Sequence, residues 1–556
     1  MQVTGREAIL EIFRLEGVEY VFGIPGATEV LFMDGLEDCP DIKYILGLHE
    51  VVVAGMAEGY ARTSGKVGVL NLHTGTGLSA ALPMLSNAYQ GGVPLVITAG
   101  QQDTRLQAYE PALAGELVRL AGPFTKWATE IIHAEDIPTV LRRAFKVAAH
   151  PPGGPVFVSL PQNIMDGRLK FEYVKGAPSY TCTHPDPKSI NVAADLLSSA
   201  RNPAIIVEDG VAKGEALAEV VRFAELIGAP VYEWWMSDVN FPTDHALYAG
   251  DLDLASLRTR DILAKVDVLV AIGTELFSQP VYLDESLLSP ATQLIHIDNN
   301  PWQIGKNFPV ASGIEGDIKA AVVDLTSALL RKMSVEELGG AKVRVRAIGE
   351  ERQKADKRFA EKALMEKDRV PISATRLMQE IRDNLKVGTR IVDDCWSCSA
   401  ILRRTLPFAE AKSYQRARNG GSIGWGLPGA LGVKLASPDR PVVGICGDGS
   451  ALWSIQTLWT ASHYDIPVTY VICANASYQQ VRNMKTLIMG DKAKGRYLGT
   501  YLDQPRNDFC KIAEGMGILT QRVERPDQLQ SVLQQAFSSA KPNLVEVYMN
   551  SAPTVG

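Results

Sequence analysis

Short apolar runs that alternate with helical segments recur along almost the whole chain. In the first third, "VGVLNL" (67–72), "VPLVITAG" (93–100) and "GPVFVSLP" (154–161) are short runs of this kind, each bounded by glycine, proline or polar residues. Runs of this length are typical of strands that are buried on both faces, and the segments between them carry helical periodicity. The pattern predicts βαβ units, and therefore an α/β fold built on parallel sheets.

The chain is too long for one such sheet. It has 556 residues, of which 46% are apolar, and single hydrophobic cores stop growing well below this length. We expect three α/β domains, each with a mostly parallel central sheet. "HPDPKS" (184–189) resembles a linker, and a charge-rich stretch that is poor in strands is expected to form a solvated, partly helical connector. The predicted division is an N-terminal domain (1–180), a central Rossmann-like domain (188–333), the charged connector (334–368) and a C-terminal domain (369–556).

Charge and hydropathy exclude several classes of partner. The net charge is −7 with acids and bases interspersed, which argues against nucleic acid and against an anionic membrane. No apolar run reaches the ~18 residues of a membrane helix, and the N-terminal stretch lacks the apolar segment of a signal peptide. We therefore expect a cytoplasmic protein that acts on small molecules.

Seven cysteines in a chain of this length form no disulfide framework. Cys395 and Cys398 form a lone CxxC, which could be a redox pair or two ordinary buried thiols. The second interpretation is favoured, because no other pair of this kind accompanies them.

One polar cluster interrupts the apolar runs of the last third. In "GICGDGSALWS" (444–454), Asp448 stands between Gly447 and Gly449 directly after a predicted strand, and a second strand ends at Asn475. A helix between the two strands would make one βαβ unit and bring both side chains to neighbouring carboxyl ends, where such sheets bind ligands.

Asp448, Asn475 and the backbone carbonyl of Ser477 are therefore predicted ligands of Mg²⁺. Gly447, Gly449 and Ser450 would let the backbone approach a diphosphate at the start of the next helix. The alternative is a tight turn with a surface aspartate that caps a helix.

The cluster and its surroundings resemble a known family. The stretches that carry the resemblance are "VFGIPGATE" (21–29), "LHEVVVAGMAEGYAR" (48–62), "NLHTGTG" (71–77), "NGGSIGWGLPGALGVKLA" (419–436) and the GDG…N segment. Together they resemble thiamine-diphosphate-dependent 2-oxo acid decarboxylases, nearest the benzoylformate decarboxylases and next the acetohydroxyacid synthase-like enzymes. The resemblance covers nearly the whole chain. It implies pyrimidine-binding (PYR), central and diphosphate-binding (PP) domains, with thiamine diphosphate and Mg²⁺ as cofactors.

The resemblance also implies residue roles. Glu50 matches the glutamate that bonds N1′ of the cofactor's aminopyrimidine and so promotes carbanion formation at C2. Its apolar neighbours favour the neutral acid, although an acid held by a helix N-terminus is the structural alternative. His73 matches a proton-relay histidine, Ser397 a diphosphate contact, Gly421 a backbone carbonyl for N4′, and Ile423 the apolar wedge that bends the cofactor. In this family, the glutamate and the metal motif belong to different subunits, so a homodimer is the minimal unit and a homotetramer is expected.

The match weakens at the substrate end. Ala27 stands where the decarboxylases have a serine, and Gln480 beside Val481 replaces a small apolar pocket residue. A second histidine is expected near 273–285, but the polar residue closest to that position is Gln279, with Pro280 at the aligned place. The predicted reaction is therefore non-oxidative decarboxylation of a 2-oxo acid other than phenylglyoxylate. The alternative is carboligation or cleavage of acyloins.

Features of other protein classes are also present but incomplete. "GTGLSA" (75–80) fits a dinucleotide fingerprint and would indicate a nicotinamide oxidoreductase, but the expected acidic residue is misplaced, since Asp103 comes late. A flavin in the central domain is conceivable from the fold alone, and we predict none. A non-catalytic paralogue is disfavoured, because it would have no need of Glu50, Asp448 and Asn475 together.

Overall fold

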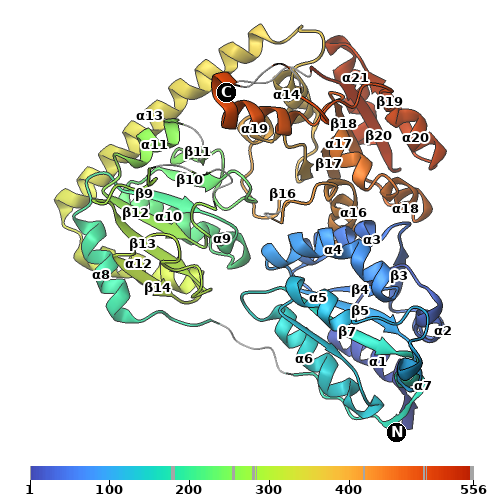
Figure 1. Cartoon of the computed structure of the whole chain (residues 1–556). Helices are drawn as coiled ribbons and strands as arrows, with labels where there is room; N and C mark the ends of the chain where they lie inside the picture. The colour runs from blue at the N-terminus through green and yellow to red at the C-terminus, as the bar shows by residue number, and fades with distance from the viewer. Residues whose placement is uncertain are drawn as a thin grey trace.

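The computed structural model describes residues 2–176, 182–252, 257–278, 282, 285–417, 420–492, 495 and 497–550. Three six-stranded parallel sheets follow one another along the chain, each flanked by helices (Figure 1). The predicted α/β class with three parallel sheets is confirmed. Among the described residues, no helix is long and apolar enough to cross a membrane.

The first sheet has the strand order β3-β2-β4-β5-β7-β6. A two-stranded antiparallel pair, β1 and β8, lies beside it. The strands are β1 (Gln2–Thr4), β2 (Tyr20–Gly23), β3 (Lys43–Leu46), β4 (Gly68–Leu72), β5 (Leu95–Gln101), β6 (Trp127–Glu130), β7 (Pro155–Pro161) and β8 (Arg168–Lys170). The helices are α1 (Gly5–Glu16), α2 (Val30–Glu37), α3 (Glu50–Ser64), α4 (Thr74–Gln90), α5 (Leu117–Ala121), α6 (Ile137–Ala149) and α7 (Gln162–Asp166).

The middle sheet has the order β11-β10-β9-β12-β13-β14, the arrangement of a dinucleotide-binding Rossmann fold. Its strands are β9 (Ala204–Val207), β10 (Val231–Trp234), β11 (Tyr248–Leu252), β12 (Val268–Ile272), β13 (Gln293–Asp298) and β14 (Ser312–Glu315). Its helices are α8 (Pro187–Ser198), α9 (Gly210–Lys213), α10 (Leu217–Ile227), α11 (Leu257–Leu263) and α12 (Ile318–Lys332).

The third sheet has the order β16-β15-β17-β18-β20-β19. Its strands are β15 (Arg390–Asp394), β16 (Tyr414–Arg416), β17 (Val442–Gly447), β18 (Thr469–Ala474), β19 (Leu519–Val523) and β20 (Asn543–Tyr548). Its helices are α14 (Ala374–Asn384), α15 (Ser399–Thr405), α16 (Gly426–Ala436), α17 (Asp448–Trp453), α18 (Thr457–His463), α19 (Gln479–Met489), α20 (Phe509–Gly515) and α21 (Leu529–Ser538).

The first and third sheets share one topology. Numbered by their own six strands in chain order, both run 2-1-3-4-6-5. In each, the strand order reverses between the first and third strands, β2 and β4 in one sheet and β15 and β17 in the other. Ligands of open α/β sheets bind at the carboxyl ends of the strands at such a reversal, so each sheet offers one site.

The charged connector is one long helix. α13 (Val335–Met365) begins with a capping box in which Ser334 accepts from the Glu337 backbone and the Glu337 side chain accepts from Ser334. Arg344 and Arg352 donate to backbone carbonyls of the middle domain. The helix runs from the middle domain to the C-terminal domain along the outside of the molecule (Figure 1). The sequence predicted only partial helix there, because the stretch has little amphipathic pattern.

Two helices bring the N-terminal and C-terminal domains together. α3 packs on α16 at a distance that only glycine allows, because a Cβ on Gly432 would lie 2.1 Å from the Met56 carbonyl oxygen. A Cβ on Gly59 would lie 2.4 Å from the Gly429 carbonyl oxygen. This contact sets the position of α3, whose first residue is Glu50.

The segment after Asp448 differs from the predicted single helix. It forms two short helices, α17 and α18, separated at Ser454. Trp453 packs against Gly424, where a Cβ would lie 2.5 Å from the Trp453 Cβ. Trp453 is the last residue of α17, directly before the interruption at Ser454. Its contact with Gly424 keeps α17 close to the segment that precedes α16.

The reversal point of the middle sheet is closed by its own residues. A Cβ on Gly210 would lie 2.4 Å from the Gly273 Cα, and Glu208 accepts hydrogen bonds from the Thr274 hydroxyl (2.8 Å) and the Glu275 amide (3.1 Å). That the central domain carries no flavin stays a prediction.

Burial, with the nearby Asp209 and Glu275 carboxylates, raises the pKa of Glu208 to about 8.

This carboxyl group makes the stability of the wild type pH-dependent. The folded state holds the Glu208 proton up to about pH 8, whereas the unfolded state releases it near the ordinary value of 4.5. Its stabilising contribution is therefore complete below pH 4.5 and is lost as the pH rises through 8. Each pH unit within this window changes the free energy of unfolding by up to about 1.4 kcal/mol.

We expect the stability of Glu208→Gln to rise by about 3 kcal/mol relative to that of the wild type between pH 6 and pH 9, because the amide has no proton to lose. Calorimetric melting of both proteins at the two pH values measures this difference. Parallel melting temperatures across the range would contradict the assignment.

Candidate active site

Asp448 lies at the end of β17, at the reversal point of the third sheet. It is buried, its Oδ1 accepts from the Gly449 amide (2.8 Å), and its Oδ2 accepts from the Ala476 amide (2.5 Å). Burial raises the pKa of the Asp448 carboxyl to about 6, against these hydrogen bonds, which lower it. The hydrogen bond to Ala476 joins Asp448 directly to the residue that follows Asn475. The two predicted positions therefore lie side by side.

The turn after β18 presents the other oxygen atoms. Asn475 and Ser477 are buried, the Asn475 Oδ1 accepts from the Ser477 amide (3.0 Å), and Ala476 between them has a positive φ of 54°. A non-glycine residue in this region is uncommon and occurs often at functional sites. The donor set of carboxylate, amide oxygen and backbone carbonyl is the hard oxygen set that Mg²⁺ prefers.

The two glycines beside Asp448 have different surroundings. A Cβ on Gly447 would make only an ordinary contact, 3.9 Å from the Asp394 carbonyl oxygen. A Cβ on Gly449 would lie 2.4 Å from the Tyr478 ring, so this turn leaves no room for a side chain there. Gly447 and Ser450 flank Asp448 and Gly449 on the same turn, with Ser450 buried. Ser397 is half-buried after β15, across the reversal point from Asp448.

A loop that carries Gly421 and Ile423 bridges the two domains. Asp394, at the end of β15, accepts from the Gly424 amide (2.9 Å) and the Gly426 amide (3.0 Å) through Oδ2. At the other end of the loop, Asn87 of α4 donates to the Ser422 carbonyl (3.0 Å) and accepts from the Ser422 amide. Gly421 has a φ of +79° and open space at its Cβ position. Ile423 is half-buried in this loop.

Sequence reasoning missed Asp394 and Asn87. Asp394 is the last residue of β15, and a carboxylate at a strand end is a usable sequence signal. Asn87 lies inside α4 and its contact crosses to the other domain, so no local pattern indicates it.

The CxxC belongs to a group of buried thiols. Cys395, Cys398 and Cys473 have their sulfur atoms within 4.8 Å of one another and are all buried. The structure describes all seven cysteines, and each is a free thiol. The burial of these thiols agrees with the favoured interpretation of the CxxC, which stays a prediction.

The first sheet brings its own predicted residues together. Glu50 begins α3 and is half-buried, and His73 follows β4 and begins α4. A Cβ on Gly77 would lie 3.1 Å from the Glu50 Oε1 and 3.6 Å from the His73 Cβ, so Gly77 leaves room where these two residues approach. The second glycine of "GTGLSA" thus faces Glu50 inside α4, which differs from the strand-to-helix turn of a dinucleotide site.

Ala27 lies close to His73 at the same reversal point. A Cβ on the preceding Gly26 would lie 2.0 Å from the His73 Nδ1, so the imidazole packs directly on this glycine. Ala27 is exposed, and its carbonyl accepts from the Gln162 side chain (3.2 Å). Gln480 and Val481 lie in the first turn of α19, where Val481 is exposed. Gln279 and Pro280 lie outside the described residues.

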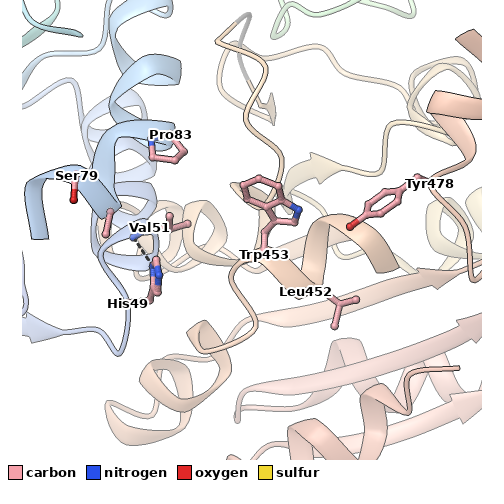
Figure 2. Close-up of a pocket in the computed structure, with 8 residues that line it drawn as sticks. His49, Val51, Ser79, Pro83, Leu452, Trp453 and Tyr478 are labelled. Atoms are coloured by element: carbon pink, nitrogen blue, oxygen red, sulfur yellow. Dashed lines mark hydrogen bonds between the residues drawn. The ribbon is translucent and has the colours of Figure 1, made fainter. Parts of the chain in front are cut away.

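A cavity of about 530 Å³ lies between the two domains. Figure 2 shows side chains of α3 and α4 facing those of α17 and of the segment before α19. The lining residues are neighbours of Glu50 on one side and of Asp448 and Ser477 on the other: His49, Val51, Ser79, Ala80, Pro83, Leu452, Trp453 and Tyr478. A small molecule in this space would therefore contact both domains.

Comparisons with known proteins cover the whole chain. Residues 3–124 match the thiamine pyrophosphate enzyme N-terminal TPP binding domain, residues 190–325 the central domain, and residues 396–547 the C-terminal TPP binding domain. A probable acetolactate synthase large subunit of Methanocaldococcus jannaschii is 31% identical over 99% of this chain and 92% of its own length. Benzoylformate decarboxylase of Pseudomonas aeruginosa is 31% identical over 98% of both chains.

Solved structures agree with these matches. A thiamine diphosphate-dependent 4-hydroxybenzoylformate decarboxylase of Rhodococcus jostii RHA1 superposes with a TM-score of 0.86 at 28% identity, covering 99% of each chain. Benzoylformate decarboxylase of Polynucleobacter necessarius gives a TM-score of 0.86 at 25% identity and the same coverage.

Proposed function

Because this chain belongs to the family of thiamine pyrophosphate enzymes, we propose that it decarboxylates a 2-oxo acid non-oxidatively to an aldehyde, using thiamine diphosphate and Mg²⁺. The observation that carries the proposal is the junction of Asp448 with the turn Asn475–Ser477 at neighbouring strand ends. Asp448 is 5% exposed, and its carboxylate lies beside two further oxygen atoms, so a bound cation would offset the cost of burying its charge beyond what the two backbone hydrogen bonds provide.

Asp448, Asn475 and Ser477 would hold the metal ion. Gly447, Gly449 and Ser450, with Ser397 across the reversal point, would bind the diphosphate. The Cβ position of Gly447 is open enough for this approach, since the Asp394 carbonyl oxygen, at 3.9 Å, makes only an ordinary contact there. Gly421 and Ile423 lie on the loop that Asp394 and Asn87 fix, which supports their roles as backbone acceptor and apolar wedge.

When bound, thiamine diphosphate supplies a nucleophilic carbon and accepts the electron pair that the departing carbon dioxide leaves. The chain's own residues then hold and move protons. Glu50 would share a proton with the pyrimidine ring of the cofactor whose diphosphate the partner subunit holds. His73 exchanges a proton with the substrate through Nε2, since its Nδ1 faces Glu29. Histidine suits this task because it titrates near neutral pH.

Ala27, Gln480 and Val481 would line the substrate pocket. Ala27 offers no hydroxyl to a substrate carboxylate, and Gln480 adds a polar group at a different place. These two differences from the benzoylformate decarboxylases favour a 2-oxo acid other than phenylglyoxylate as the substrate. Capture of an acceptor aldehyde, giving a 2-hydroxy ketone, is the second candidate activity, and the similarity to acetolactate synthases favours it.

The active unit is proposed to be a homodimer, and the assembly a homotetramer. The domain limits proposed above, 1–180, 188–333 and 369–556, keep each sheet whole. Apolar side chains on the segment after β5, Leu106, Tyr109 and Leu113, are exposed, and Tyr109 is 81% exposed. A partner subunit that covers this segment would explain their exposure.

A panel of 2-oxo acids, with and without acceptor aldehydes, tests the proposed reaction. With thiamine diphosphate and Mg²⁺ present, we expect carbon dioxide release and an aldehyde from at least one aliphatic or aromatic acid, identified by mass spectrometry. Added aldehydes should divert part of the product to 2-hydroxy ketones. The Glu50→Gln variant serves as the control for uncatalysed release. Absence of cofactor-dependent turnover with every acid would refute the proposal.

A further inference from the structure

Behind His73 lies a buried carboxylate that sequence reasoning overlooked. Glu29 is 1% exposed, and its Oε2 lies 2.8 Å from the His73 Nδ1. The His73 side chain is 23% exposed, so the pair has a buried end and an accessible end. Both residues lie at the reversal point of the first sheet, Glu29 after β2 and His73 after β4.

Glu29 receives four hydrogen-bond donors. Its Oε2 accepts from the Gly26 amide (2.9 Å) as well as facing His73, and its Oε1 accepts from the Gly100 amide and the Thr28 hydroxyl, both at 2.8 Å. Two carboxylate oxygens have about four lone-pair positions, so the ionised group is fully used as an acceptor. A proton on Glu29 would displace one of these donors.

The surrounding backbone is built to fit this pair. A Cβ on Gly100 would lie 2.2 Å from the Glu29 Oε1, and a Cβ on Gly26 would overlap the His73 ring. Both glycines therefore leave space that the two side chains fill. The geometry cannot relax by a rotation of Glu29 without breaking its backbone hydrogen bonds.

We propose that Glu29 is a positioning residue that fixes His73 in the Nδ1–H tautomer and so leaves Nε2 as the atom that exchanges a proton with the substrate. The effect on catalysis rests on the proposed function, whereas the tautomer of His73 does not depend on it. Because an acceptor-only carboxylate faces Nδ1, that nitrogen must donate, and neutral imidazole carries its single proton there. Thr28 Oγ1, 3.2 Å from Nδ1, donates to Glu29 and supports the same arrangement.

The tautomer can be read directly by ¹⁵N NMR of the histidine-labelled protein, with His73 assigned through His73→Ala. We expect the wild type to show a protonated Nδ1 and an unprotonated Nε2 at a pH where the ring is neutral. Glu29→Gln should populate the Nε2–H form, because its amide NH₂ can donate to Nδ1. A wild-type ring protonated at Nε2 would overturn the inference whatever the variants do.

A double-mutant cycle gives the second readout. Glu29→Gln should lower kcat/KM by about 100-fold, near the lower end of what a positioned acid–base group supplies. In the His73→Ala background, the same substitution should change kcat/KM by less than about threefold, since the route through the imidazole is already lost. Effects that multiply independently would show a merely structural role and refute the proposal.

Glu208→Gln is the matched control. Glu208 also follows the first strand of its sheet and accepts from a threonine hydroxyl and a backbone amide, but no histidine contact accompanies it among the described residues. We expect its activity to stay within about twofold of the wild type. If wild-type protein turned over no 2-oxo acid, the proposed function would fail, while the NMR measurement would still decide the tautomer.

Discussion

Replacing Asp448 with alanine is expected to abolish magnesium-dependent retention of thiamine diphosphate. The substitution removes the only charged group of the proposed metal site, so we expect the affinity for the cofactor to fall by about 100-fold or more. The amides of Gly449 and Ala476 would each lose a buried acceptor, which costs about 1–3 kcal/mol of stability per group. Isothermal titration of thiamine diphosphate with Mg²⁺, and again with EDTA, measures the effect.

Two further variants separate metal binding from folding. Asp448→Asn keeps an acceptor for the backbone and loses the charge, so it should fold like the wild type and still bind the cofactor weakly. Asp298→Ala removes a buried strand-end aspartate of the middle domain, which accepts from the Asn300 amide, and should leave cofactor affinity within about twofold. Unchanged magnesium-dependent affinity in Asp448→Ala would remove Asp448 from the metal site.

The strands predicted from the sequence are mostly the central ones. β4, β5, β12 and β17 are buried along almost their whole length and appear in the sequence as short, mainly apolar runs. Five edge strands carried no such signal, because one side meets solvent or polar groups: β6, β11, β14, β16 and β19. β16 has only three residues, "YQR". Its two polar side chains are buried by contacts with other domains, since Gln415 donates to Thr63 and Arg416 donates to the Trp235 carbonyl.

The contacts of the candidate site likewise include some that the sequence predicts and some that it does not. Asp448 and Asn475 belong to one βαβ unit, so their proximity follows from the crossover rule and could be predicted. The Glu29–His73 contact joins residues that are separated in the sequence by α2, β3, α3 and β4. In the local sequence, Glu29 simply stands three residues after Gly26, which is the spacing of an ordinary capping box. Only the tertiary arrangement shows that the carboxylate faces an imidazole.

The contacts of the loop 420–426 show the remaining difficulty. Ser422 is held by Asn87 from one domain, and Gly424 by Asp394 from the other. Asp394 at least ends a strand of the same domain, whereas Asn87 cannot be found without knowing that α3 and its neighbour α4 pack against the C-terminal domain. A family resemblance supplied the roles of Gly421 and Ile423, but the physical reason for the loop's position lies in these long-range hydrogen bonds.

Replacing Glu50 with glutamine should remove turnover while sparing cofactor binding. The amide cannot hold or release the proton that the carboxyl group shares with the pyrimidine ring, so we expect kcat to fall by about 10³-fold, within the range of general acid–base catalysis. The diphosphate end of the proposed site involves other residues, so thiamine diphosphate affinity should stay within about threefold. Steady-state kinetics at saturating cofactor, together with titration of the cofactor, measures both.

A helix-terminus role for Glu50 predicts a different result. Glu50 is the first residue of α3, and an acid at this place stabilises a helix by about 0.3–1 kcal/mol. Glu336→Gln removes an acid from the first turn of α13 and so reproduces that loss without touching the site. If Glu50→Gln lowered only the melting temperature, as Glu336→Gln should, the carboxyl group would be structural. A large loss of kcat with an unchanged melting temperature assigns it to catalysis, because the helix dipole acts on stability and has no means of slowing the chemical step alone.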